Sequence, residues 1–119
     1  MQQHLTRIEQ ANLIAGHAVS YATAYLDGRH TAQQLADNAD RLFLDLLVIQ
    51  TAETSAFLVP VQLLAVTMMR AARDAREDRR LLYSTTTVGE ERDERWRAVM
   101  GALVELLLAE SRQLAKDRA

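Results

Sequence analysis

The chain has 119 residues, a formal net charge of -2 and no cysteine. A chain of this length fits one domain and can bury roughly two-thirds of the surface that its unfolded form exposes. The near-neutral charge provides no global field for attracting nucleic acid or an anionic membrane. The absence of cysteine excludes disulfides, thiolate zinc sites and cysteine nucleophiles. The composition therefore predicts a single domain, residues 1–119, held together by an apolar core.

The sequence indicates no membrane or secretion segment. Arg7 and Glu9 fall where a signal peptide would need its apolar segment. The longest uncharged stretch, residues 54–69, is shorter than the roughly 18 to 20 apolar residues needed to cross a bilayer. We therefore expect a cytoplasmic protein with no membrane partner.

The spacing of apolar residues predicts helices almost throughout. Glycine and proline are scarce, and apolar side chains recur at steps of three and four. A first helix is expected over residues 6–26. Gly28 lies just beyond it and can form a left-handed C-cap. A second helix begins at Thr31, whose side chain forms a capping box with that of Gln34.

The second helix has the widest apolar face. Phe43 and Leu47 widen its main stripe, so this helix is predicted to be the most buried one. The residues of the main stripe are Leu35, Ala39, Leu42, Leu46 and Ile49.

Pro60 interrupts the next apolar stretch, because proline lacks an amide proton and crowds the preceding turn. Two arrangements follow: a tight turn before a third helix that starts at Pro60 and ends near Leu82, or one long second helix kinked at Pro60. We favour the turn. The residues expected to point inward from the third helix are Val61, Leu64, Met68, Ala71 and Ala75.

A fourth helix is predicted after a polar loop, from a capping box at residues 87–90. Its apolar stripe consists of Trp96, Val99, Met100, Leu103, Leu106, Leu107 and Leu114. Helices of similar length joined by short links predict an all-α fold, an antiparallel four-helix bundle.

The sequence contains no pattern typical of a catalytic or metal site. Its histidines, His4, His17 and His30, lack the spacing of helical metal ligands. No serine lies in a glycine elbow, and no glycine-rich loop could hold a phosphate. We therefore expect no enzyme activity, no cofactor and no metal. The alternative is a small-molecule-binding or catalytic bundle in which Glu53, Glu110 or His17 lines an internal polar pocket.

The densest run of charge lies late in the third helix. Arg73, Arg76 and Arg80 share one flank, which at helical spacing forms a secondary charged patch. Acidic residues within the same run neutralise it, and no aromatic side chain is interleaved for stacking on bases. We therefore expect a solvated helix face and no nucleic-acid partner.

The first helix carries two apolar faces. One contains Leu5, Ile8, Asn12, Ala15, Val19, Ala22 and Leu26. The opposite one contains Ile14, Ala18, Tyr21 and Tyr25, with His17 beside it. Two tyrosines and an isoleucine approach the few hundred Å² at which an exposed patch indicates an interaction. This second face is expected either to contact a partner or to be covered by the bundle itself.

These features favour a small protein-protein interaction module over an enzyme, partly by exclusion and partly by analogy of fold. The specific hypothesis is a bacterial or phage regulator that binds and inhibits a protein target, as an anti-activator, antitoxin or inhibitor does. The chain is expected to be a homodimer. The second face of the first helix would either form that dimer or occupy a hydrophobic groove on the target, with Tyr21 and Tyr25 as anchors.

Overall fold

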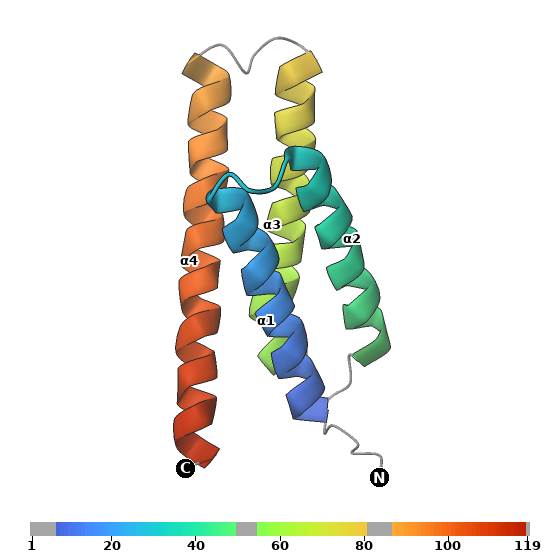
Figure 1. The fold of residues 1–119 in the computed structure, drawn as a ribbon, viewed down its shortest axis with the longest axis vertical. Helices are drawn as coiled ribbons and strands as arrows, with labels where there is room; N and C mark the ends of the chain where they lie inside the picture. The colour runs from blue at the N-terminus through green and yellow to red at the C-terminus, as the bar shows by residue number, and fades with distance from the viewer. Residues whose placement is uncertain (1–6, 50–54, 81–86, 119) are drawn as a thin grey trace.

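The computed structural model describes residues 7–49, 55–80 and 87–118, all but a few of them in four helices. The helices are α1 (Arg7–Leu26), α2 (Ala32–Ile49), α3 (Ser55–Arg80) and α4 (Thr87–Arg118). Consecutive helices run in opposite directions and form an elongated bundle, 53 Å long and 25 Å wide (Figure 1). The protein is an antiparallel four-helix bundle, which confirms the predicted fold class.

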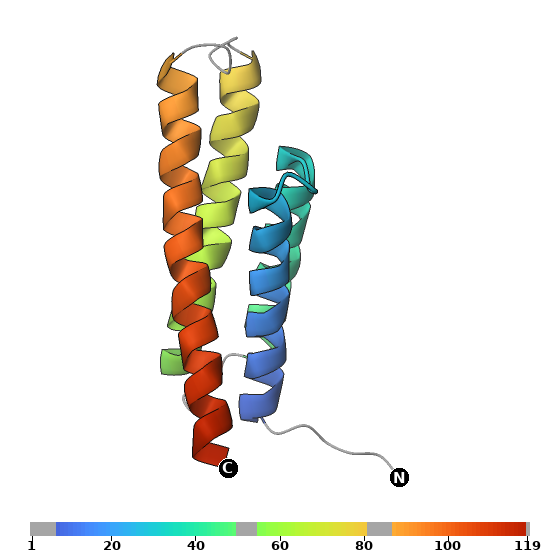
Figure 2. The ribbon, with the colours of Figure 1, turned by 60° about the vertical axis from the view of Figure 1, so that its left-hand side comes forward.

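The four helices differ in length and in the number of their neighbours. The α3–α4 hairpin extends beyond α1 and α2 at one end of the bundle, as both views show (Figures 1 and 2). Within the described residues, α1 and α3 each contact all three other helices, whereas α2 and α4 do not contact each other. Because α1 has neighbours on three sides, more than half of its circumference can be buried.

The turn between α1 and α2 has the predicted chemistry. Gly28 adopts a φ of 78°, and its amide donates to the carbonyl of Tyr25 at 3.0 Å. Thr31 and Gln34 form the reciprocal capping box: the Thr31 amide donates to the Gln34 side chain at 2.8 Å, and the Gln34 amide donates to the Thr31 hydroxyl at 3.2 Å. Both predictions for this turn are confirmed.

The second and third helices are separate, as the favoured arrangement predicts, but the third helix does not begin at Pro60. The second helix ends at Ile49, and α3 begins at Ser55 and continues through Pro60. Because Pro60 lies near the start of α3, its missing amide costs a single helical hydrogen bond, the one to the carbonyl of residue 56. The proline ring is buried, which offsets part of that cost.

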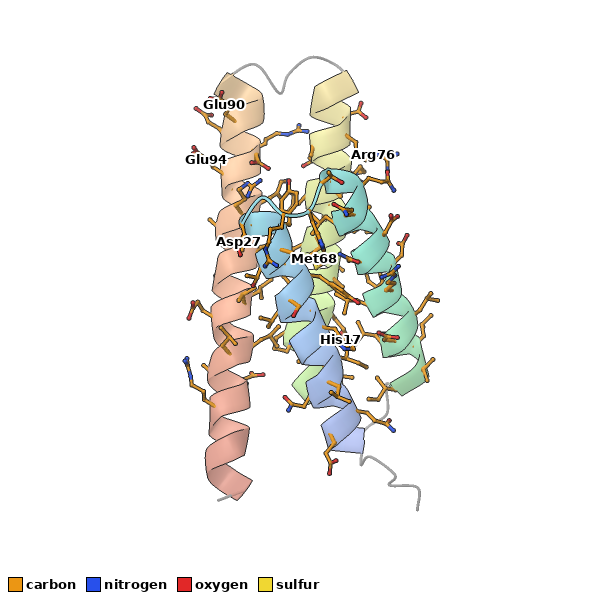
Figure 3. All side chains as sticks on the ribbon, viewed as in Figure 1. His17, Asp27, Met68, Arg76, Glu90 and Glu94 are labelled. Atoms are coloured by element: carbon orange, nitrogen blue, oxygen red, sulfur yellow. The ribbon has the colours of Figure 1, made fainter. Side chains whose placement is uncertain are left out.

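The core lies along the centre of the bundle, where Met68 appears between the helices in Figure 3. The main stripe predicted for α2 is buried, and so is the stripe predicted for α3 except Ala75, which is half-buried. The largest fully buried side chains are Leu35, Leu42, Leu58, Leu64, Met68, Met100 and Val61.

Candidate protein-interaction surface

The second face predicted for α1 belongs to the core, so its placement on the outside of the bundle is wrong. Ile14, Ala18 and Tyr25 are buried, and Tyr21 is half-buried and packs against the core. The reason is the position of α1 between three other helices, since α2, α3 and α4 together cover both of its apolar faces. The chain itself thus covers the tyrosines, the alternative that the sequence left open.

Only the polar member of that group faces solvent. His17 is exposed, and its ring lies 6.2 Å from that of Tyr21 (Figure 3). On the face predicted to be inward, Ala15 and Ala22 are buried, whereas Asn12 is exposed. The side chains of Leu5 and Ile8 lie outside the described part of the chain.

Tyr25 joins the end of α1 to α4 through a polar cluster. Its hydroxyl donates to a carboxylate oxygen of Asp93 at 3.2 Å, and Arg97 donates to the other oxygen at 2.6 Å. The Arg97 guanidinium lies 4.6 Å from the centre of the Tyr25 ring, in cation–π geometry. It also donates to the carbonyls of Tyr25 and Leu26 at 3.3 Å. A cation is thereby placed at the negative end of the α1 dipole.

The pKa values in this cluster follow from burial and from the charge of Asp93. Burial raises the pKa of the Tyr25 hydroxyl above its ordinary value of 10.0, and the nearby Asp93 carboxylate raises it further. For Arg97, burial lowers the pKa, but the hydrogen bond and charge of Asp93 outweigh it, so its pKa is raised overall. Both groups therefore keep their protons at neutral pH, and the cluster acts as a structural clasp.

A second polar cluster joins α3 to α4. The Trp96 indole donates to Asp74 at 2.7 Å, and the Arg92 guanidinium lies 3.5 Å from the other oxygen of the same carboxylate. The single tryptophan is therefore fixed at the helix interface by its polar edge. Asp74 lies between positions 92 and 96 of α4, which places it level with about position 94.

Exposed apolar residues concentrate on the C-terminal half of α2. Leu44, Leu47 and Val48 are 63%, 77% and 83% exposed. The prediction that Leu47 widens the buried face of α2 is therefore wrong. Because α2 contacts α1 and α3 but not α4, a narrower arc of this helix is covered than the sequence pattern suggested.

A groove follows the contact between α2 and α3 on the outside of the bundle. Its apolar part has a volume of about 380 Å³ and is lined by Phe43, Leu46, Leu47, Gln62 and Val66. These side chains come from the end of α2 and the first half of α3, which lie side by side because the two helices are antiparallel. We call this hollow the apolar half of the α2–α3 groove.

A second hollow lies further along the contact between α2 and α3 and is charged; we call it the charged half of the α2–α3 groove. It encloses about 590 Å³ and is lined by Ala36, Asp40, Met69, Arg73, Arg76 and Glu77. Two members of the predicted arginine patch, Arg73 and Arg76, are exposed here, and Figure 3 shows Arg76 on α3 near the start of α2. The side chain of the third, Arg80, lies outside the described part of the chain. Arg73 and Arg76 therefore lie beyond the apolar half of the groove, further along α3 toward the tip of the α3–α4 hairpin.

The outer sides of α3 and α4 carry further apolar residues. Val59 and Leu63 on α3 are exposed, as are Val99 and Leu106 on α4. The last two belong to the stripe predicted to be buried, whereas Met100 and Leu107 of that stripe are indeed buried. The described α4 therefore has a narrower buried face than its sequence suggests.

The residues considered for an internal polar pocket are not brought together. His17 is exposed on α1 and Glu110 is half-buried on α4, while Glu53 lies outside the described residues. In the described ranges, no three acidic or histidine side chains are close enough to hold a metal ion. Nor does any helix there have the length and hydropathy needed to span a membrane.

Comparison with known proteins adds no relative: no family model matches the chain, no curated protein matches its sequence and no solved structure matches it. The class of protein is thus defined by the fold, a four-helix bundle with a groove on its outer side. The groove is the feature that carries the functional argument.

Proposed function

We propose that the chain is a protein-protein interaction module that binds a protein target through the α2–α3 groove. A regulatory role, in which binding inhibits the target, a cytoplasmic location and association of the chain with itself are parts of the same proposal. The observation that carries it is the exposure of Leu47 and its neighbours beside an apolar hollow of about 380 Å³. Apolar patches of this kind on a small protein mark interaction sites.

The shape and chemistry of the groove favour an amphipathic helix of the target as its occupant. The antiparallel helices α2 and α3 lie side by side and form a groove in which a helix of the target can bind. The apolar residues of that target helix would contact Phe43, Leu47 and Val66.

At the other end of the groove, Arg73 and Arg76 are exposed and offer bidentate donors. Asp40 and Glu77 line the same end. The expected target helix therefore has apolar residues at one end and charges of both signs at the other, with carboxylates placed at the two arginines.

The proposal is tested with a charged residue placed in the apolar half of the groove. The chain is used as bait in an extract of its native cell, and captured proteins are compared between the wild type and Leu47→Glu. We expect one partner to be lost in the variant, because a carboxylate in an apolar contact is costly to desolvate. The captured partner is then purified, and its affinity for both chains is measured.

Leu13→Glu is the matched control, because Leu13 is also an exposed leucine, 52% exposed, but it lies on α1 away from the groove. We expect this variant to retain the partner. Arg73→Glu should weaken binding of the purified partner roughly tenfold and reduce the dependence of binding on salt. Equal loss of the partner in the Leu13 and Leu47 variants, or retention in both, would contradict the proposal.

A further inference from the structure

The outer side of α3 carries a row of residues with the spacing of a coiled-coil seam. The row alternates steps of four and three, the period at which helices pair along their length. Only Val66 in this row is half-buried, and the others are exposed. Its members are Val59, Leu63, Val66, Arg70, Arg73 and Glu77.

The chemistry of the row suits a particular antiparallel register. Antiparallel helices with this spacing place unlike seam positions opposite each other, so Leu63 of one helix faces Val66 of the other. By symmetry this apolar layer occurs twice. The next layer sets Val59 against Arg70, whose aliphatic stem can cover the valine while its guanidinium extends beyond it.

A carboxylate on α4 favours the same register independently. Asp74 of α3 is level with about position 94 of α4, as its contacts with Arg92 and Trp96 show. The helices are antiparallel, so Glu110, sixteen residues further along α4, is level with position 58 of α3, next to Val59. In the register that pairs Leu63 with Val66, Arg70 of the other helix arrives at this level.

We propose that a second copy of the chain packs antiparallel on this row of α3, with the two-fold axis between Leu63 and Val66. The apolar layers lie at the axis, and Arg70 of each copy pairs with Glu110 of the other. This inference deepens the self-association included in the proposed function. It rests on the self-association in that function. Val66, Arg73 and Glu77 of the row also line the α2–α3 groove, whereas Leu63 and Glu110 do not, so substitutions at Leu63 and at Leu47 separate the second copy from the target.

The size of the surface predicts a weak dimer. Val59, Leu63, Val99 and Leu106 are 42% to 52% exposed. With roughly 100 Å² per aliphatic side chain, they leave on the order of 200 Å² of apolar surface uncovered. Interfaces of this small class occur in complexes that dissociate readily. We therefore expect dimers at tens of micromolar that separate on dilution.

Cross-linking tests the position of the axis. The chain has no cysteine, so Leu63→Cys introduces a single thiol that lies close to its counterpart across the axis. A bis-maleimide that spans about 10 Å, the separation of packed helices, should convert this variant into a covalent dimer. Leu13→Cys is the matched control, because both leucines are 52% exposed and Leu13 lies on α1, away from the row. Equal yields from the two variants would overturn the inference.

A charge exchange tests the register. Arg70→Glu and Glu110→Arg should each weaken dimerisation roughly threefold in sedimentation equilibrium, as expected for a pair at the rim of an interface. The combined variant should recover the wild-type dissociation constant. A combined variant at least as weak as either single one would overturn the proposed pairing. So would a wild type that stays monomeric at about 1 millimolar, roughly an order of magnitude above the expected range.

The two proposals fail separately. If Leu63→Glu leaves the oligomeric state unchanged while Leu47→Glu loses the target, the second copy is excluded and the target groove stands. If Leu63→Glu yields a helical monomer while Leu47→Glu keeps the target, the dimer stands and the groove is excluded.

Discussion

Tyr25 shows how one side chain satisfies both the core and a polar contact. Its ring is buried, only 6% exposed, while its hydroxyl reaches Asp93 on α4. From the sequence alone, Tyr25 looks like an apolar residue with no place in the core, because the acceptor of its hydroxyl lies 68 residues away. Leu47 is the converse case, since its helical position suggests burial but its side chain is 77% exposed. Neither outcome follows from the residue and its near neighbours alone.

Tyr25→Phe separates the hydroxyl from the ring. The variant keeps the contact with Arg97 and loses the bond to Asp93, so we expect a loss of about 1 kcal/mol in the free energy of unfolding at pH 7. Because the pKa of Tyr25 is raised in the folded protein, the protonated hydroxyl contributes stability below pH 10, and this contribution is lost as the pH rises through the folded-state pKa. The difference between wild type and variant should therefore shrink above pH 10.

Chemical denaturation between pH 7 and pH 11 measures both effects. Tyr21→Phe is the control, since it leaves the bond between Tyr25 and Asp93 intact. It should lose free energy of unfolding above pH 10 as the wild type does. A Tyr25→Phe variant that loses stability with pH as steeply as the wild type would refute this account of the cluster.

At the scale of the helices, the caps and turns could be predicted from the sequence. The face that each helix turns to the core could not. The Thr31 capping box and the Gly28 C-cap depend on contacts within one or two turns, and both were predicted. The inward residues of α3 were predicted only in part, since Leu58, Ala65 and Ala72 are also buried.

The face that α1 turns to the core depends on how many helices surround it. Among the described residues, α1 has three neighbouring helices and α2 has two. Tyr25 on the second face of α1 is therefore buried, whereas Leu47 of α2 is exposed.

The glycines of α1 and its following turn provide an opposed pair of substitutions. Gly28 has a φ of 78°, so Gly28→Ala forces a side chain into the left-handed region and should destabilise by about 1 kcal/mol. Gly16 lies inside α1 with nothing within 4 Å of an added Cβ, so Gly16→Ala should stabilise by about 0.5–1 kcal/mol. Thermal unfolding of both variants measures the two shifts. Shifts of the same sign would contradict the assigned backbone conformations.

At the scale of the molecule, the bundle buries one set of apolar residues and leaves another on its outer surface. Its core includes Ile14, Ala18 and Tyr25 of α1, while the outer sides of α2, α3 and α4 retain apolar residues that are exposed. The sequence was sufficient for the four-helix bundle, because helix number and periodicity are local properties. It was insufficient for the interaction surface, because that surface consists of residues that the packing of four helices leaves uncovered.

The free energy of unfolding of two variants, Tyr25→Ala and Leu47→Glu, tests this division most directly. Truncation of a buried aromatic should cost about 3 kcal/mol or more, whereas a carboxylate at an exposed position should change stability by no more than about 0.5 kcal/mol. Urea denaturation at micromolar concentration of each variant provides the values. A stable Tyr25→Ala variant, or a Leu47→Glu variant destabilised as strongly as a core substitution, would contradict the assignment of Tyr25 to the core and of Leu47 to the interaction surface.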